Sequence, residues 1–419
     1  MRRGVARGLR ALAWAGALVG CLLVWWAATL AVAALTPVPV LFLGAGSVAA
    51  AAAWLLACRV LVRVPGRRAA AHLVGVLALA VTLASVLLPL GDPQRAPRLP
   101  PGAGTWRLED GARLAYGVVR GEDGGRATPV VVLHGGPGVP DTAGLLAAFG
   151  PLAADGHDVW AYDQRGSGRS ARLADPSGYT TTRAVADLEA VRRRIGAERV
   201  VLVGHSSGAH LAAAYTAAHP GRVERVVFSS PGGLDEQGLG GRPQERLTSA
   251  QRWRVNRLLL PPRAVLAYAL VQVDPAAAHA LAGDAEVDAR QDRVHAALRP
   301  ALHCPGRTAP ALHGLGFYAN QVPQSWRRPP GPDLRAALAG TDVPALVVKG
   351  QCDYLDWASA TGYLDVFGDS RLVYLPGTGH DLYVDAPAAV VGAVRAFLAG
   401  EPVPGTLADP RRPPAGYQP

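Results

Sequence analysis

Ser206, Asp353 and His380 are the residues whose types and spacing could perform nucleophilic catalysis. Ser206 lies in the middle of residues 204–208, GHSSG, which follow an apolar run and precede a helical segment. In that context a G-x-S-x-G sequence is typical of a nucleophile elbow, a sharp turn that presents the serine hydroxyl at a helix N-terminus. A serine is a weak nucleophile without a base, so the elbow predicts a base elsewhere in the chain.

His380 is the candidate base, and Asp353 is the candidate acid that orients it. His380 follows the predicted strand 372–375 in a glycine-rich loop, and a loop at the carboxyl end of a parallel strand lies at the catalytic edge of a sheet. Asp353 follows the predicted strand 345–349, which puts the three residues in the order serine, acid, histidine. We expect Asp353 to hold the imidazole in the correct tautomer. Asp356 is the alternative acid.

A second glycine-rich segment could stabilise the negative charge that develops during acyl transfer. Residues 134–138, HGGPG, follow the predicted strand 130–133. We expect the backbone N–H groups of Gly136 and Ser207 to form an oxyanion hole. The segment lacks the glycine patterns of phosphate-binding loops. No group of candidate ligands has metal-site spacing, so the sequence predicts neither a cofactor nor a metal.

The elements that must position these residues alternate along the chain. Short apolar runs at 130–133, 159–162, 200–203, 226–228, 345–348 and 372–375 predict strands, and the segments between most of them predict helices. This alternation predicts a doubly wound, mostly parallel sheet covered by helices on both faces. The alternation lapses from 231 to 340, which is too long for a loop and is interpreted as a helical cap.

The predicted organisation therefore has six parts. They are a three-helix transmembrane region (1–90), a Pro/Gly-rich linker (91–104), the first part of the hydrolase core (105–230), the cap (231–340), the second part of the core (341–400) and a disordered tail (401–419).

The N-terminal region predicts three membrane spans. Residues 11–58 and 69–90 contain no Asp, Glu, Lys or Arg, and a bilayer needs about 20 helical residues per span. Residues 36–39, TPVP, break the first stretch where a turn is needed. Residues 1–90 also hold eight arginines and no acid, which accounts for eight of the ten net positive charges. The basic balance belongs mainly to the membrane region and does not indicate nucleic-acid binding.

The same arginines predict the orientation of the spans. They cluster before the first span and in the loop 63–68, so the positive-inside rule places both in the cytoplasm and everything after residue 90 outside. The alternative is a signal peptide cleaved near residues 31–33. Many arginines against a single lysine indicate a bacterial genome, and we expect a plasma-membrane location. Cys304 and Cys352 lie in the exported part, where a disulfide is an open possibility.

Three motifs together resemble the proline iminopeptidase (prolyl aminopeptidase) family of α/β-hydrolases: residues 134–138, residues 163–170 (DQRGSGRS) and the serine elbow. The resemblance covers roughly residues 105–400. It implies an α/β-hydrolase fold with an inserted helical cap, and cleavage of an N-terminal residue from a peptide through an acyl-enzyme. It also implies that Asp163 and Arg165 are structural and that acidic cap residues hold the substrate amine. Glu236 and Glu245 are the candidates. Ser207 stands where the family often has Trp.

Two enzymatic functions and one non-enzymatic function follow from these residues. The first is a membrane-anchored, aminopeptidase-like serine hydrolase that acts on small peptides. The alternative is an esterase or lipase that uses the same triad on carboxylic esters. The third is a sensor or transporter accessory that has lost activity, against which an intact triad argues. Epoxide hydrolases and dehalogenases are excluded because the elbow carries Ser and not Asp. The oligomeric state is not determined by the sequence.

Overall fold

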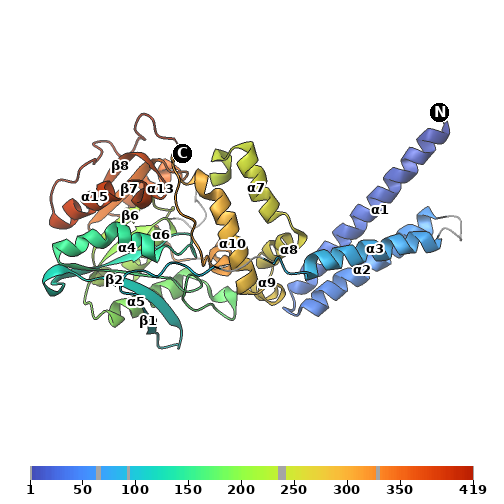
Figure 1. The fold of residues 1–419 in the computed structure, drawn as a ribbon, viewed down its shortest axis with the longest axis horizontal. Coiled ribbons are helices and arrows are strands. Elements are labelled where there is room, and N and C mark those ends of the chain that lie inside the picture. Colours follow the sequence, from blue (N-terminus) through green and yellow to red (C-terminus); the bar gives the residue numbers. More distant parts are fainter. Residues whose placement is uncertain (1, 63–67, 92–94, 235–241, 327–330, 419) are drawn as a thin grey trace. The chain divides into compact units, whose positions relative to one another are not determined.

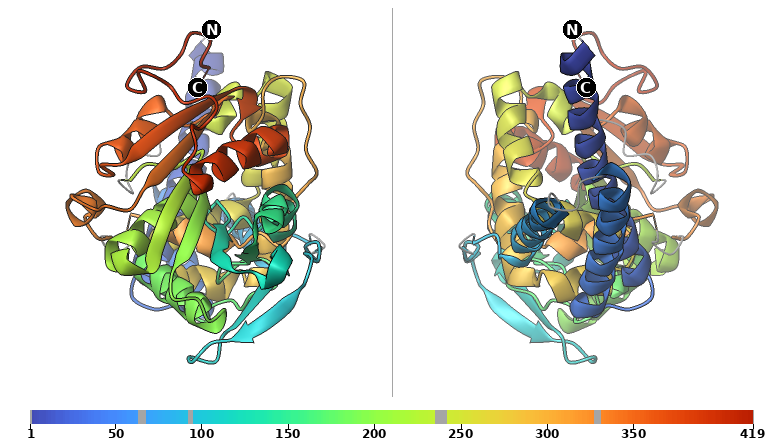
Figure 2. Two further views of the ribbon diagram at one scale, coloured as in Figure 1. Left: turned by 90° about the vertical axis from the view of Figure 1, so that its left-hand side faces the viewer. Right: turned by 90° about the vertical axis from the view of Figure 1, so that its right-hand side faces the viewer.

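The computed structural model describes residues 2–62, 68–91, 95–234, 242–326 and 331–418, and it divides into two compact units. The first unit comprises residues 1–91, 259–286 and 325–327, and the second comprises residues 92–258, 287–324 and 328–419. Figure 1 and Figure 2 show the ribbon coloured along the sequence.

The first unit contains three helices that are each long and apolar enough to cross a membrane. They are α1 (Arg2–Ala33), α2 (Pro39–Leu61) and α3 (Arg68–Leu87), and the apolar part of α1 starts at Ala11. Consecutive helices contact one another, as the blue ribbons in Figure 1 show. The break between α1 and α2 falls at the predicted Thr-Pro turn, because proline cannot continue a helix without losing a hydrogen bond.

Part of the predicted cap belongs to this first unit. Helices α8 (Pro262–Val271) and α9 (Pro275–Leu281) pack with the apolar helices. Buried Arg263 joins α8 to α3, because its guanidinium donates to the carbonyl oxygen of Val86 in the last turn of α3 (2.6 Å). The same guanidinium pairs with Glu286 (2.6 Å). The carbonyls of a last helical turn lack partners within the helix, so an arginine can satisfy them. The sequence pattern did not indicate this association.

The second unit is built around an eight-stranded sheet with the strand order β1-β2-β4-β3-β5-β6-β7-β8. The strands are β1 (Gly104–Arg107), β2 (Arg113–Val119), β3 (Ala127–Leu133), β4 (His157–Tyr162), β5 (Val200–His205), β6 (Val223–Ser229), β7 (Ala345–Cys352) and β8 (Ser370–Gly379). Only β2 pairs antiparallel with its neighbours β1 and β4, and the other pairs are parallel. The predicted fold class, a mostly parallel doubly wound sheet, is confirmed.

Helices cover both faces of this sheet (Figure 1). Helices α5 (Thr181–Arg194), α6 (Ser207–Ala218) and α13 (Trp357–Leu364) pack on one face, and α4 (Thr142–Phe149) and α15 (Pro387–Ala399) pack on the other. Side chains alternate along the strands: Val131 contributes to the core on the first face, and Val130 and Val132 contribute to the core on the second. Strands buried on both faces read as continuous apolar runs, which is why periodicity located them.

The remaining helices of the second unit are short or lie in the cap region. They are α7 (Ser249–Leu259), α10 (Asp284–Leu298), α11 (Phe317–Gln321), α12 (Leu334–Leu338) and α14 (Leu382–Asp385).

The C-terminal segment, predicted to be disordered, is packed on the second unit in the described residues 401–418. The Leu407 N–H donates to the carbonyl of Leu372 (2.9 Å), and the Tyr417 hydroxyl donates to the carbonyl of Leu355 (2.5 Å). The structure differs from the prediction because this proline-rich segment finds backbone acceptors on an existing surface and needs no core of its own.

Candidate active site

Ser206 occupies a strained turn between β5 and α6. Its φ of 55° and ψ of −118° are unusual for a residue with a side chain, and only Ser230 among the other described non-glycine residues has a positive φ. Backbone bonds hold the turn: the Ser206 N–H donates to Ser229 (2.9 Å), and its carbonyl accepts from Gly232 (3.1 Å). The chain therefore forms a nucleophile elbow at the predicted position.

Glycine is required on either side of the elbow. A Cβ atom on Gly204 would lie 2.3 Å from the carbonyl oxygen of Gly208, and a Cβ atom on Gly208 would lie 2.4 Å from the carbonyl oxygen of Leu133. Because these neighbours are backbone atoms, no side-chain adjustment could relieve the contact.

The structure brings Asp353 and His380 together. His380 Nδ1 lies 2.8 Å from Asp353 Oδ1, and both side chains are buried. The pair forms because β7 and β8 are adjacent parallel strands whose carboxyl ends meet at one edge. The alternative acid, Asp356, is exposed at the start of α13. The tertiary structure thus distinguishes two carboxylates that the sequence left open.

The serine elbow follows β5, two strands away from β7 in the same sheet, and the Asp353–His380 pair follows β7 and β8. Within the described residues, the Ser206 hydroxyl makes no hydrogen bond to His380. The ring of His205, directly before Ser206, lies 5.0 Å from the His380 ring between centroids. Hydrogen bonds between a nucleophile and its base often tighten only in the complex with substrate.

Asp353 has a second partner, the cation of Lys349, that sequence reasoning did not identify. Lys349 Nζ lies 2.8 Å from Asp353 Oδ2, and both residues are completely buried. Burial raises the pKa of the Asp353 carboxyl, but the Lys349 charge and His380 outweigh burial and hold that pKa well below its usual range. The available signal was a lone lysine within an apolar strand, four residues before Asp353.

The predicted oxyanion loop lies against the elbow. A Cβ atom on Gly135 would approach the Ser206 Cβ to 2.8 Å, and Gly136 has a φ of 117° that favours glycine. Ser207 is the first residue of α6, and N–H groups of a first helical turn have no acceptor within the helix. Asn320 fastens the loop by donating to the carbonyl of Pro137 (2.8 Å).

The segment 163–170 is hydrogen-bonded to the oxyanion loop. Arg165 donates twice to Asp187 (2.8 and 2.7 Å), and Asp163 accepts from the Arg169 N–H (2.9 Å). The Gln164 N–H donates to His134 Nε2 at 2.9 Å, which joins the two loops. These contacts agree with the structural role that the resemblance implies for Asp163 and Arg165.

A buried polar cluster surrounds the base. His205 Nε2 lies 3.4 Å from Asp381, and Arg299 lies 3.6 Å from the same carboxylate. Burial lowers the pKa of the His205 imidazole. His205, His380 and Asp381 present ligand atoms within 4.8 Å of one another, a spacing that a cation could use. Asp353 already holds His380 Nδ1, and Asp381 pairs with His205, so the cluster can serve as support without an ion.

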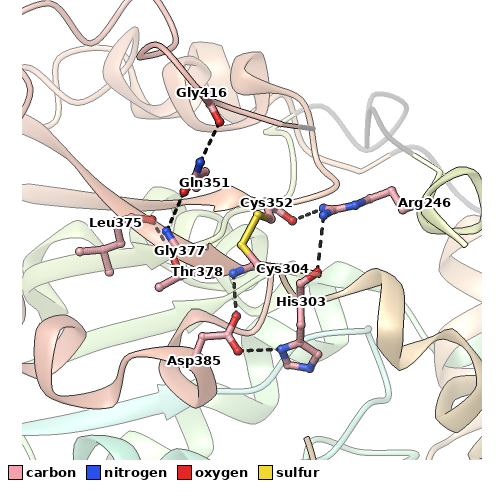
Figure 3. The surroundings of a disulfide bond; sticks show 11 residues. Arg246, His303, Cys304, Gln351, Cys352, Leu375, Gly377, Thr378, Asp385 and Gly416 are labelled. Carbon is pink, nitrogen blue, oxygen red and sulfur yellow. Dashed lines mark hydrogen bonds and ion pairs between the residues drawn. A yellow bond between two sulfur atoms is a disulfide. The ribbon is translucent and has the colours of Figure 1, made fainter. Parts of the chain in front are cut away.

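A disulfide joins Cys304 to Cys352, with their Cα atoms 5.2 Å apart (Figure 3). Cys352 directly precedes Asp353. Cys304 lies two residues after Leu302, whose carbonyl accepts the His380 N–H (2.6 Å). The bond therefore fastens the segment that supports His380 to the strand that carries Asp353.

Two side chains beside the disulfide, His303 and Arg246, form further contacts in the same region (Figure 3). His303 Nδ1 lies 2.9 Å from the carboxylate of Asp385, and that carboxylate accepts the Gly379 N–H (2.7 Å). Arg246 donates to the carbonyls of Cys352 and His303.

The two glutamates predicted to bind substrate are not brought to the triad by any described contact. Glu236 lies outside the described residues. Glu245 lies in the short 3-10 helix Pro243–Arg246, with its side chain 67% exposed and 3.6 Å from Arg242. Their predicted role stays a prediction.

A cavity of about 140 Å³ opens beside the elbow. Ser207 and Gly138 line it, together with mainly apolar groups such as Leu211 and Ala319. Its one carboxylate among the described lining residues, Asp187, is the partner of Arg165. The cavity can accept an apolar group of a substrate whose carbonyl lies at the elbow.

Comparison with known proteins agrees with this geometry. The chain is 41% identical over 110 residues to the proline iminopeptidase of Heyndrickxia coagulans, which covers 26% of the chain and 37% of that protein. It is 27% identical over 299 residues to the proline iminopeptidase of Levilactobacillus brevis, covering 65% of the chain and 88% of that protein. The solved structure of VinJ has the same fold, with a TM-score of 0.50, 20% identity and coverage of 72% of this chain and 99% of VinJ.

The alignment spans little more than a third of the length of the Heyndrickxia protein. The family model described as the alpha/beta hydrolase fold matches residues 128–387, which is more than half of the 419 residues. The chain therefore belongs to the α/β-hydrolase fold family, and it is similar to proline iminopeptidases.

Proposed function

We propose that this protein is a membrane-anchored aminopeptidase that removes N-terminal residues from small peptides through an acyl-enzyme. The observation that carries the proposal is the combination of a strained serine elbow with a buried Asp353–His380 pair of 2.8 Å at the same sheet edge. The names of the relatives support the peptide substrate.

In the proposed reaction, Ser206 Oγ bonds to the carbonyl carbon of the substrate while its proton passes to His380 Nε2. Asp353 holds Nδ1 and stabilises the imidazolium. The N–H groups of Gly136 and Ser207 stabilise the tetrahedral oxyanion. The C–N bond then breaks as His380 returns the proton to the leaving amine. Water adds to the acyl-enzyme with His380 again as the base, and the ester bond to Ser206 breaks.

The decisive experiment compares matched substrates on the purified full chain. An aminoacyl arylamide with a free amine, the same compound with an acetylated amine and a p-nitrophenyl ester of the same acyl group separate the reaction classes. We expect hydrolysis of the free-amine arylamide and hydrolysis of the acetylated arylamide that is at least ~100-fold slower. Ser206→Ala should hydrolyse neither arylamide. Equal hydrolysis of the free and acetylated arylamides would contradict an aminopeptidase.

The second candidate is an esterase, and the cavity beside Ser207 favours it. The only carboxylate among its described lining residues is engaged by Arg165, which leaves no acid there to bind a substrate amine. An esterase would hydrolyse the p-nitrophenyl ester and neither arylamide.

We also propose that the catalytic unit lies outside a bacterial plasma membrane, anchored by α1, α2 and α3. The arginine distribution supports this orientation. The Cys304–Cys352 disulfide supports it independently, because disulfides persist in oxidising compartments. Protease added to intact spheroplasts should remove the hydrolase unit and leave the anchor. Protection of the whole chain until the membrane is permeabilised would contradict the orientation.

A further inference from the structure

We infer that Lys349 is a positioning residue of the catalytic machinery, which fixes the Asp353 carboxylate in its ionised form and orientation so that His380 can act as the base. The inference rests on the proposed roles of Ser206, Asp353 and His380. It assigns a function to the single lysine in a chain that contains 42 lysine and arginine residues together.

The contacts of Lys349 account for all of its hydrogen-bonding capacity. An ammonium group has three donors. Nζ lies 2.8 Å from Asp353 Oδ2, 2.9 Å from the carbonyl oxygen of Leu355 and 3.2 Å from Ser359 Oγ. Three acceptors that converge on one nitrogen suit a compact ammonium, whereas the planar fork of an arginine would spread its donors.

Both oxygens of the Asp353 carboxylate are also engaged. Oδ2 accepts from Lys349, while Oδ1 accepts from the Leu355 N–H (3.1 Å) and lies 2.8 Å from His380 Nδ1. Lys349 and His380 thus hold opposite oxygens of one carboxylate. Rotation of the carboxylate away from His380 would break the bond to Lys349, so the lysine restricts the orientation that the base requires.

Stability alone does not explain a lysine at this position. Lys349 is completely buried in the middle of β7, and the four residues before it, 345–348, are all apolar and buried. A buried ion pair commonly contributes no more stability than well-packed apolar side chains of similar volume. The lysine is therefore better explained by what it does to Asp353.

The charge of Lys349 also affects the reaction. With Lys349, the Lys–Asp–His group changes from neutral to +1 when His380 accepts the serine proton; without it, the group changes from −1 to neutral. Loss of the lysine therefore changes the charge against which His380 accepts the serine proton. Other titratable or charged groups lie near Lys349, Asp353 and His380, namely His205, Arg246, His295, Tyr354, Asp356, Asp381 and Tyr417. Among the described residues, only Lys349 and His380 form ion pairs with Asp353.

The test measures the rate at which a fluorophosphonate labels Ser206, as a function of pH, in the full chain. We expect Lys349→Met to slow labelling at pH 7 by at least ~100-fold, in the range that loss of a positioned base gives. We also expect the acidic limb of its pH profile to move up by about one pH unit, the effect of removing one adjacent charge. Thr216→Val, a buried hydroxyl in α6 replaced by a methyl group, is the control and should keep the wild-type profile.

Two further arms keep the outcome interpretable. If Lys349→Met does not fold by circular dichroism, Lys349→Gln, which keeps the donors and most of the length, should show the same shift of the acidic limb. The role of Lys349 is refuted, and the triad stands, if the wild type is labelled and both folded variants are labelled within threefold of its rate with the same pH profile. If wild type is not labelled, or Ser206→Ala is labelled equally, the triad itself fails and the inference fails with it.

Discussion

Replacing Gly208 by alanine should disable the enzyme without unfolding it. The new Cβ atom would lie 2.4 Å from the carbonyl oxygen of Leu133 and 2.7 Å from that of His134. Real Cβ atoms do not approach other atoms within 3.0 Å, so the first distance must grow by 3.0 − 2.4 = 0.6 Å or more. Both oxygens are backbone atoms at the end of β3, where the oxyanion loop begins, so the movement displaces the loop that carries Gly136.

The magnitude follows from two opposing effects on stability and one on catalysis. Overpacking costs about 1–3 kcal/mol, and alanine in a helix recovers about 0.5–1 kcal/mol relative to glycine. The net loss of stability should therefore be about 0–2.5 kcal/mol. Loss of one donor from an oxyanion hole lowers the rate by about 10²–10³-fold. Activity should therefore fall far more than stability.

The assay compares fluorophosphonate labelling and thermal unfolding of Gly208→Ala with those of Gly392→Ala. Gly392 lies in α15, and its added Cβ atom would meet no heavy atom within 4 Å. The control should label at the wild-type rate and be more stable by about 0.5–1 kcal/mol. Wild-type labelling by folded Gly208→Ala would refute the reasoning, because the elbow could then accommodate a side chain without moving the oxyanion loop.

Three further perturbations have defined outcomes. Replacing both Cys304 and Cys352 by serine should lower the free energy of unfolding by about 4 kcal/mol, the loop-closure value for their separation of 48 residues. An unchanged melting temperature in non-reducing buffer would contradict this. Burial raises the pKa of the Asp141 carboxyl to about 6, so the folded protein retains a proton that the unfolded chain releases, and stability falls as pH rises from about 4 to 6. Asp141→Asn should remove that loss: in urea titrations its free energy of unfolding should exceed that of the wild type by about 3 kcal/mol at pH 7 and equal it at pH 4. Arg263→Met should lower the free energy of unfolding in detergent by about 3–5 kcal/mol, because Glu286 loses its ion pair. Adding Glu286→Gln to the Arg263→Met chain should restore part of that free energy.

Local physical chemistry let the sequence determine the elements of this protein. The strands are apolar runs buried on both faces, so their positions follow from composition within a few residues. The serine elbow depends on neighbouring residues alone, because a turn with the φ of Ser206 needs glycines two residues away on each side. The three apolar helices follow from length and the absence of charge. The fold class could therefore be predicted before any contact was known.

The partners of individual side chains were decided by the tertiary structure. Asp353 and Asp356 are three residues apart with the same chemistry, and only the adjacency of β7 and β8 gives the first of them to His380. The disulfide depends on a Cα separation between residues far apart in the sequence. The contact between the Lys349 ammonium and Asp353 likewise exists only in the folded chain.

The same division explains the cap and the C-terminal segment. Residues 259–286 join the apolar helices through Arg263, whose acceptors lie in α3 and at the end of α9. Residues 401–418 are held by acceptors that exist only after the sheet has formed. Hydrophobic periodicity records which side of an element is buried, but it does not record which neighbour buries it. That choice is made when distant segments compete for the same surfaces and hydrogen-bonding groups, and it becomes visible only in the folded chain.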